Sequence, residues 1–594
     1  MIRYLKKYWL FALLAPLFMV GEVFMDLLQP RLMSTIVDEG VLGLSNNGVG
    51  DLNLVLTTGI KMIGFVLIGG LCGIMSGVFA NMCSQNFGND VRKDCFAKVM
   101  QLSFEQTDRF STGSLITRVT NDITQVQNMV GMCIRGFVRN IIMFFGGIFC
   151  MVQLHMSFGK VVIIALPLVI AMVVFFIGKA NPLYSVLQKK LDRVNSVMQE
   201  NVSGTRVVKA YVRENYEKER FKEANEGLIE TQLRVLVLFS YMTPILNIIL
   251  NVSVVAVIYI GGIEVKGGSI TPGEIMAAIT YISQILHGIM MMSMTFQNIS
   301  RGSASAKRLN EVIDCEPVIK DGSFGGYHVS KQPDKEGKIE FKNVSFSYPQ
   351  GNGREVLHDI NLTIEPGETV GILGATGSGK SSLVHLIPRF YDATTGDVFV
   401  DGVNVKEYEL TALRDKVAIA LQKSELFHAT MKENIKWGNG DASQEEIRHA
   451  TDIACASEFI DVSPDGYDTL VAENGMSLSG GQKQRLSISR AVLKAAKGAK
   501  ILIFDDTTSA LDLKTEAKLY AALNAEYEHL TKVIIAQRIA SVKDADRIAV
   551  IDEGTIIACA SHEVLMETCE IYQDIYNSQL KSHKEVNKEE WHNE

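Results

Sequence analysis

The segment over residues 374–381, Gly-Ala-Thr-Gly-Ser-Gly-Lys-Ser, most constrains what this chain can fold into. It follows an apolar run, residues 369–373, that predicts a buried strand, and it precedes residues 382–387, which predict the start of a helix. The glycines let successive backbone N–H groups point inward, and the helix N-terminus adds the positive end of its dipole. This order of strand, loop and helix predicts an α/β domain that binds a nucleoside triphosphate.

The same loop supplies the groups expected to hold the phosphates and a metal ion. Lys380 would reach the outer phosphates, and the Ser381 hydroxyl would ligate Mg²⁺. A later apolar run predicts another buried strand that ends in Asp505 and Asp506, and Asp505 is placed to hold Mg²⁺ opposite Ser381. The expected ligands are therefore a nucleoside triphosphate and Mg²⁺. The other loop residues assigned to the nucleotide site are Gly374, Thr376, Gly377, Ser378, Gly379 and Ser382.

The first half of the chain contains long apolar runs. Five of them approach or exceed the roughly 20 residues that a helix needs to cross about 30 Å of hydrocarbon, and a further one near the N-terminus is interrupted by Glu22 and Asp26. We expect an α-helical six-span transmembrane domain with long cytoplasmic helix extensions, followed by an α/β P-loop nucleotide-binding domain. The expected spans are residues 10–36, 60–82, 138–157, 159–178, 235–263 and 275–297. The expected domains are residues 1–310 for the membrane, 311–336 for a linker, 337–580 for nucleotide binding and 581–594 for a charged tail.

Charge predicts the orientation of the spans. Lysine and arginine concentrate between spans two and three, as at Arg92 and Arg118, and between spans four and five, as at Lys189 and Arg220. The positive-inside rule therefore places these long segments and both termini in the cytoplasm. The formal net charge of −8 argues against nucleic acid as a partner.

Two short breaks interrupt the helical pattern of the long cytoplasmic segments, one at Gly113 and Ser114 and one at Thr205 and Arg206. They are either ordinary helix–helix connections or a pair of cytoplasmic contact points, and the residues alone favour neither. Within the first span, Glu22 and Asp26 lie four residues apart on one helix face, where polar packing inside the helix bundle is expected.

Residues 478–484 form another glycine-rich turn at the start of a helix, which is either a second phosphate-facing surface or a plain helix cap. With this motif order the chain resembles an ATP-binding cassette (ABC) half-transporter of the exporter type over nearly its whole length. The resemblance implies that the family signature closes over ATP held by another chain, so that the working unit is a dimer with a second half-transporter. It also implies an adenine-stacking role for Tyr348, a Mg²⁺-sensing role for Gln422, and coupling helices at the two cytoplasmic breaks. The signature residues are Leu478, Ser479, Gly480, Gly481 and Gln482, and the D-loop contributes Asp512.

Two positions depart from the family pattern. Asp506 stands where the family usually has a glutamate that acts as general base, and Gln537 stands where it has a switch histidine. Asp is one methylene shorter than Glu, and Gln cannot carry the proton of an imidazole. Because the binding motifs are intact, the chain resembles the degenerate-site subunit of a heterodimeric bacterial exporter, with low ATPase activity expected for the chain alone.

The resemblance implies ATP-driven export of an amphipathic drug, lipid or peptide by a multi-pass protein of the bacterial cytoplasmic membrane, with its termini and ATP-binding domain in the cytoplasm. One alternative is an importer with exporter-like architecture, of the metal-chelate type. Another is a sensor or regulatory membrane protein in which ATP acts as a gate. A transport assay with sided vesicles separates these hypotheses.

Overall fold

A computed structural model describes residues 1–325, 336–349, 351 and 353–579. The expected tail over 581–594 and residues 326–335 of the expected linker lie outside the described residues. The chain divides into two compact units, one of residues 1–100 and 113–315 and the other of residues 101–112 and 316–594. Residues 101–112, which interrupt the first unit in sequence, thus pack with the second.

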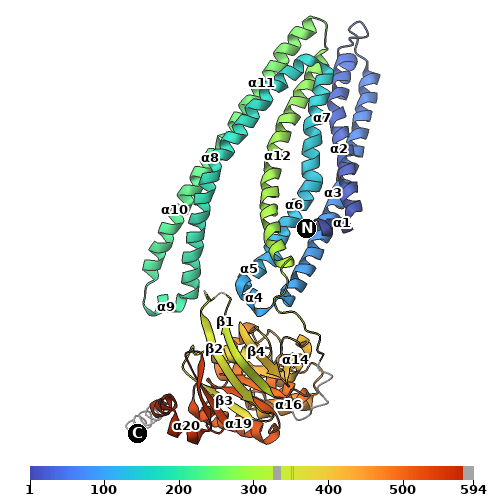
Figure 1. Cartoon of the computed structure of the whole chain (residues 1–594). Coiled ribbons are helices and arrows are strands. Elements are labelled where there is room, and N and C mark those ends of the chain that lie inside the picture. The colour runs from blue at the N-terminus through green and yellow to red at the C-terminus, as the bar shows by residue number, and fades with distance from the viewer. Residues whose placement is uncertain (326–335, 350, 352, 580–594) are drawn as a thin grey trace. The chain divides into compact units, whose positions relative to one another are not determined.

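The first unit is entirely helical, and six of its helical segments are long and apolar enough to cross a membrane, which confirms the six-span prediction (Figure 1). Their exposed apolar side chains form surfaces that lipid would cover; on α3, for example, Leu67 and Ile74 are 68% and 65% exposed. The candidate spans are Trp9–Val41, Leu52–Gln101, Thr112–Leu154, Met156–Ser203, Glu214–Lys266 and Pro272–Ile313.

These segments contain α-helices with short π-helical turns (η) between some of them. The long helices α8 and α10 run side by side and are joined by the short α9 (Figure 1). The elements are α1 Ile2–Lys7, α2 Trp9–Thr35, η1 Ile36–Val41, α3 Leu52–Gln101, α5 Thr112–Thr117, η2 Arg118–Asp122, α6 Ile123–Met132, η3 Cys133–Phe137, α7 Val138–Leu154, α8 Met156–Ser203, α9 Thr205–Ala210, α10 Glu214–Ser240, α11 Met242–Lys266 and α12 Pro272–Ile313.

The two carboxylates of the first span share an arginine from another helix. Arg139 of α7 lies 3.5 Å from a carboxylate oxygen of Glu22 and 3.4 Å from one of Asp26. An ion pair between helices lowers the cost of charge at membrane depth. These residues therefore tie α2 to α7, with the Glu22 side chain 14% exposed and those of Arg139 and Asp26 45% and 39% exposed.

The second unit is built on two sheets. The six-stranded sheet has the order β10-β9-β3-β8-β7-β6, in which β9, β3, β8, β7 and β6 are parallel and β10 is antiparallel to β9. The four-stranded antiparallel sheet has the order β2-β1-β4-β5. The strands are β1 Ile339–Ser347, β2 Glu355–Ile364, β3 Thr369–Leu373, β4 Thr395–Val400, β5 Val403–Asn404, β6 Val417–Ala420, β7 Ile501–Asp505, β8 Thr531–Ile535, β9 Arg547–Asp552 and β10 Thr555–Ala560.

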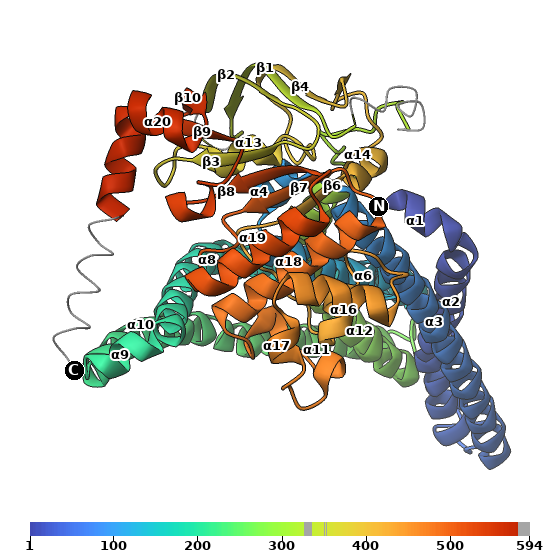
Figure 2. The ribbon, with the colours of Figure 1, turned by 90° about the horizontal axis from the view of Figure 1, so that it is seen from below.

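Figure 2 shows the antiparallel sheet on one side of the six-stranded sheet and α16, α18 and α19 on the other. The two hydrophobic cores of the unit follow this layering, because one fills the space between the sheets around α13 and the other lies under the helices. The central strands β3, β8 and β7 are buried on both faces, which explains why apolar residues predominate in them. The helices are α4 Phe104–Phe110, α13 Lys380–His385, α14 Leu410–Lys416, α15 Met431–Ile435, α16 Gln444–Ile453, α17 Ser457–Ile460, α18 Gly480–Lys497, α19 Leu513–Glu526 and α20 His562–Thr568.

Candidate nucleotide site

The phosphate loop connects the end of β3 to the start of α13, in the setting that the sequence predicted. Gly377 and Gly379 have φ of 87° and 98°, values that favour glycine because they strain other residues. A Cβ on Gly374 would lie 2.2 Å from the carbonyl oxygen of Ile551. The loop therefore needs glycine at three positions to hold its backbone in this curve.

Helix α13 begins with Lys380 and Ser381, and both side chains make hydrogen bonds at the place where a phosphate would bind. The Lys380 ammonium donates to the carbonyl oxygens of Gly374 (2.9 Å) and Ala375 (2.7 Å), inside the curve of its own loop. The Ser381 hydroxyl donates to Oδ1 of Asp505 at 2.7 Å, so the structure brings together the two predicted Mg²⁺ ligands. Burial lowers the pKa of Lys380, and the neighbouring carboxylates of Asp506 and Asp505 oppose that shift.

Tyr348 lies beside the same loop. Its hydroxyl is 2.9 Å from the Ser382 hydroxyl, and its ring stands edge-on to that of Phe346 at 4.8 Å between centroids. Tyr348 and the loop residues Thr376, Gly377 and Ser378 line one cleft of about 730 Å³. The hydroxyl of Ser378 is buried with no hydrogen-bond partner among the described residues, as expected of a group that would meet a phosphate oxygen.

Asp506 follows β7 and is 6% exposed, with φ of 49°. Its Oδ2 accepts two side-chain amide hydrogen bonds, one from Gln537 at 2.7 Å and one from Gln422 at 3.2 Å. Burial raises the pKa of Asp506, while the two amide donors pull that pKa down. The structure thus joins both departures from the family pattern in one hydrogen-bonded cluster.

The signature sequence lies at the N-terminus of α18. Ser479 caps this helix by accepting from the backbone N–H of Gln482, and the Gln482 side chain accepts from the backbone N–H of Ser479. Gly480 is exposed and lines a cleft with Gln422 and Ala510, separate from the cleft that Tyr348 and the phosphate loop line. Leu478 is partly buried, and Gly481 packs against the backbone of Ala510. The structure therefore does not bring the signature to the phosphate loop of its own chain.

Gln484, a residue that sequence reasoning missed, connects the D-loop to the signature helix by hydrogen bonds. Gln484 of α18 donates to the Ser509 hydroxyl at 3.2 Å and accepts from the Ala510 backbone N–H at 3.0 Å. Asp512 then caps α19 by accepting from the backbone N–H of Thr515. A glutamine one turn into a helix carries no signal of this role in the sequence.

The segment that carries Gln537 is held by another residue that was missed. Gln579, in a helix that includes residues 570–579, donates to the carbonyl oxygen of Gln537 at 2.8 Å and accepts from the backbone N–H of Ile539 at 2.9 Å. It therefore fixes the backbone on both sides of Arg538. Only the tertiary fold places Gln579 at this loop.

The predicted cytoplasmic breaks lie in short helices. Gly113 and Ser114 lie in α5, and Thr205 and Arg206 begin α9, where both are exposed. The nearby contacts with the nucleotide-binding unit come from the preceding helix, α4, which the sequence analysis did not single out. Phe104 packs against Phe390 with 4.6 Å between ring centroids, and Tyr391 donates a 2.8 Å hydrogen bond to Asp108.

Comparisons with known proteins agree with this architecture. The family model of the ABC transporter transmembrane region matches residues 12–290, and that of the ABC transporter ATP-binding region, described as "ABC transporter", matches residues 357–509. The chain is 36% identical over 98% of both chains to the uncharacterized ABC transporter ATP-binding protein YfiB of Bacillus subtilis. It is 32% identical to an ATP-dependent lipid A-core flippase of Syntrophus aciditrophicus, over 87% of this chain and 84% of that one. A solved bacterial Atm1-family ABC exporter with ATP bound shares the fold, with a TM-score of 0.78, 24% identity, and coverage of 97% of this chain and 98% of that one.

A P-loop nucleotide site on a six-span helical membrane domain defines a membrane-spanning ATPase that couples its reaction to transport. The chain belongs to the ABC transporter family, as a half-transporter of the exporter type. It is a multi-pass protein of the plasma membrane, and its ATP-binding domain is cytoplasmic.

Proposed function

We propose that this chain drives export of an amphipathic substrate as one half of a heterodimeric ABC transporter whose ATP site on this chain hydrolyses slowly. The observation that carries the proposal is the position of Asp506, whose Oδ2 lies between the amides of Gln422 and Gln537. An ATPase needs a carboxylate that can reach the attacking water and a partner that stabilises the developing charge.

In this proposal hydrolysis is slow because the Asp506 carboxylate lies too far from the attacking water, and not because it is a weak base. Burial raises the pKa of Asp506, so its carboxylate is, if anything, a stronger base than an exposed aspartate. Its side chain is nevertheless one methylene shorter than that of glutamate, and misplacement by about 1 Å costs roughly 100-fold in rate. Gln537 donates a neutral hydrogen bond and cannot supply the charge of an imidazolium.

The residues that bind nucleotide remain suited to their task. Lys380 and the glycines of its loop would hold the phosphates, and Tyr348 would stack on adenine. Hydroxyl, carboxylate and amide oxygens are ligands that Mg²⁺ takes, and Ser381, Asp505 and Gln422 would hold the ion. When bound, Mg²⁺ neutralises charge on the β- and γ-phosphates. Each of these residues binds or orients ATP without requiring a strong general base.

The intact signature gives this chain a role in the other half of the dimer. Ser479 and Gly480 are exposed at the N-terminus of α18, where backbone N–H groups and the helix dipole suit the phosphates of another chain's ATP. The partner's site would then supply the fast hydrolysis. Closure would reach the spans through α4, through Gly113 and Ser114, and through Thr205 and Arg206.

The substrate class is supported by similarity to proteins described as lipid A-core flippases. A sided-vesicle transport assay distinguishes export from import. Nucleotide binding that responds to ligand without net movement of that ligand would favour the sensor instead.

The first test is the ATPase rate of the purified chain alone and then with any membrane partner that co-purifies. The proposal predicts a nearly inactive lone chain and a pair that turns over at least tenfold faster. A lone chain that dimerises and hydrolyses ATP briskly would show that Asp506 and Gln537 suffice for catalysis, and the heterodimer proposal would fail.

A further inference from the structure

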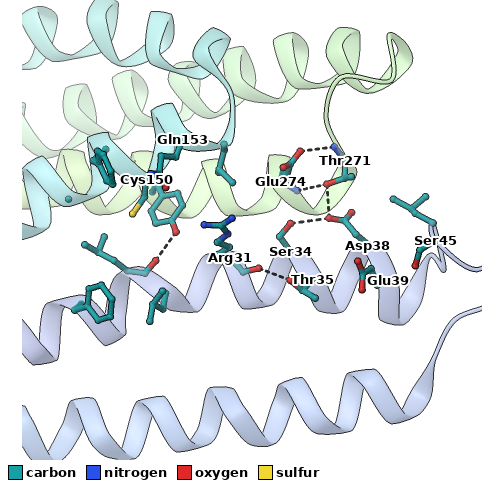
Figure 3. A pocket seen from close by; sticks show the side chains of 18 of the residues that line it. Arg31, Ser34, Thr35, Asp38, Glu39, Ser45, Cys150, Gln153, Thr271 and Glu274 are labelled. Carbon is teal, nitrogen blue, oxygen red and sulfur yellow. Dashed lines mark hydrogen bonds between the residues drawn. The ribbon is translucent and has the colours of Figure 1, made fainter.

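The transmembrane unit contains a cavity of about 850 Å³ between α2, α7 and α12 (Figure 3). It lies toward the outer ends of these helices, because α2 runs outward from the cytoplasmic N-terminus and α12 runs back toward the cytoplasmic side. Its size falls within the range of about 300–1,000 Å³ typical of small-molecule sites. Apolar side chains such as Phe24 and Leu28 and polar side chains such as Ser34 and Gln153 both line it.

The face of α2 that lines the cavity is apolar in its deeper part and carries a cation nearer its outer end. Phe24, Leu27, Leu28 and Arg31 all line it, at the spacing i, i+3, i+4, i+7 that places residues on one helix face. Arg31 lies 22 residues after the start of α2 at Trp9, which is about 33 Å along the helix. That depth corresponds to the outer edge of the hydrocarbon, so the apolar residues lie one or two turns deeper than the cation.

The Arg31 guanidinium has no ion-pair or hydrogen-bond partner among the residues that the structure describes. No carboxylate oxygen lies within 4.0 Å of its nitrogens, and it donates no hydrogen bond to any residue that the structure describes. Figure 3 shows it directed from α2 toward α12, between the walls of the cavity. A planar guanidinium at the membrane edge is suited to bidentate binding of an oxyanion.

Three carboxylates also line the cavity, and two of them are already paired. Asp38 accepts from the hydroxyls of Ser34 (2.9 Å) and Thr271 (2.6 Å) and from the backbone N–H of Gly273 (2.7 Å). Glu274 accepts from the backbone N–H of Thr271 at 2.9 Å. Both also face the N-terminus of α12, whose dipole opposes their charge.

The third carboxylate, Glu39, lies eight residues beyond Arg31, about 12 Å along the helix, and is exposed. It makes no ion pair with Arg31. Among the described residues that line the cavity, Arg31 is therefore the one cation, and it forms no ion pair with any of the three carboxylates.

We propose that this cavity binds an acyl compound with an oxyanion head, with the head at Arg31 and the chain along Phe24, Leu27 and Leu28. The proposal names the substrate class within the export function proposed above, and so rests on it. The same chemistry belongs to a free long-chain acid and to an anionic membrane lipid.

The test uses the full chain, with any partner it retains, in phosphatidylcholine nanodiscs without nucleotide. The probe is 11-(dansylamino)undecanoic acid, and its methyl ester is the uncharged match. We expect saturable fluorescence enhancement above that of empty nanodiscs, with the acid bound about tenfold more tightly than the ester, a typical effect for a charge-assisted pair. Arg31→Gln should remove that difference by weakening the acid alone, and Arg31→Lys should retain part of it.

Two further variants keep the result interpretable. Arg135→Gln removes an exposed arginine of η3 that does not line the cavity, and it should leave the preference for the acid unchanged. Leu28→Trp fills the cavity and should weaken acid and ester alike. Monodisperse elution and an unchanged melting temperature verify that each variant is folded.

Competition identifies the source of the ligand. Displacement of the probe by phosphatidylglycerol added to the nanodisc assigns the site to an anionic lipid, and no displacement assigns it to a free acid. An acid preference that persists in Arg31→Gln, or the absence of saturable binding, would overturn the proposal. Because no nucleotide is used, this result is independent of the hydrolysis test on Asp506 and Gln537.

Discussion

The Gln537 side-chain amide donates a 2.7 Å hydrogen bond to Oδ2 of Asp506, the same oxygen that accepts from Gln422. Two substitutions that are 31 residues apart in sequence thus meet at one atom. Asp506 without Gln537 would lack its shorter amide contact, and Gln537 without Asp506 would lack its acceptor. The pair therefore behaves as one unit, and the predictions about catalysis treat it so.

Restoring both family residues should raise the rate of the assembled transporter. Asp506→Glu combined with Gln537→His returns the missing methylene and an imidazole to the site, and we expect about a tenfold to 100-fold faster turnover at this site. The measurement is kcat of the reconstituted pair, with each single variant as a control. An unchanged kcat in the double variant would show that another feature limits this site.

Gly480 should affect hydrolysis at the partner's site and not nucleotide binding at its own. A Cβ at this position would meet only the Ala510 side chain at 3.6 Å, an ordinary contact, so this chain tolerates a side chain there. Gly480→Asp would place a negative charge against the partner's ATP, and we expect at least a tenfold loss of the pair's ATPase rate, with Gly480→Ala milder. Binding of a fluorescent ATP analogue to the lone variant chain should remain normal; weakened binding there would contradict the assignment.

The contribution of Asp506 to the free energy of unfolding should change with pH in the opposite direction from that of Asp512, which caps α19. Its pKa is raised by burial, so the folded chain holds this proton more tightly than the unfolded chain. Stability from this group is thus present at low pH and is lost as pH rises from the ordinary value of 3.8 through the raised pKa. Asp506→Asn should therefore raise Tm most at pH 8, and the gain should shrink on acidification.

Asp512 supplies the matched control. Hydrogen bonds from Thr515 lower the pKa of Asp512, so its contribution is present above the ordinary pKa and is lost on acidification. Asp512→Asn should lower Tm by the same amount at pH 8 and pH 5, with the loss shrinking only below the ordinary value of 3.8. Differential scanning calorimetry of the full chain from pH 8 down to acidic pH measures both, and equal signs for the two variants at pH 8 would refute the assignment.

The hydroxyl of Tyr391 should matter for coupling more than for ATP hydrolysis. Tyr391→Phe removes the 2.8 Å hydrogen bond to Asp108 of α4 and leaves the ring packing against Phe104. We expect transport per ATP hydrolysed to fall several-fold, since a hydrogen bond to a charged group contributes about 1.5–3 kcal/mol. Transport and ATPase rates are measured on the same vesicles, with Asp108→Asn as the companion variant. A proportional loss of both rates would assign the residue to hydrolysis.

The sequence predicted what depends on local pattern. Spans, the phosphate loop and the Ser381–Asp505 pairing each follow from hydropathy or from a motif whose backbone geometry is fixed, and the structure contains all three. It did not predict Arg139 as the partner of Glu22 and Asp26, because these residues are brought together only by helix packing. Gln484 and Gln579 were missed for the same reason, since a glutamine that bonds backbone groups leaves no periodicity or motif.

The signature and the phosphate loop of this chain line different clefts. In the proposed assembly, fast hydrolysis therefore requires one copy of each of the two subunits. In a cell that makes the two subunits unequally, the scarcer one sets the transport capacity, and the surplus of the other holds nucleotide without consuming it. Imbalanced expression would then lower export without wasting ATP.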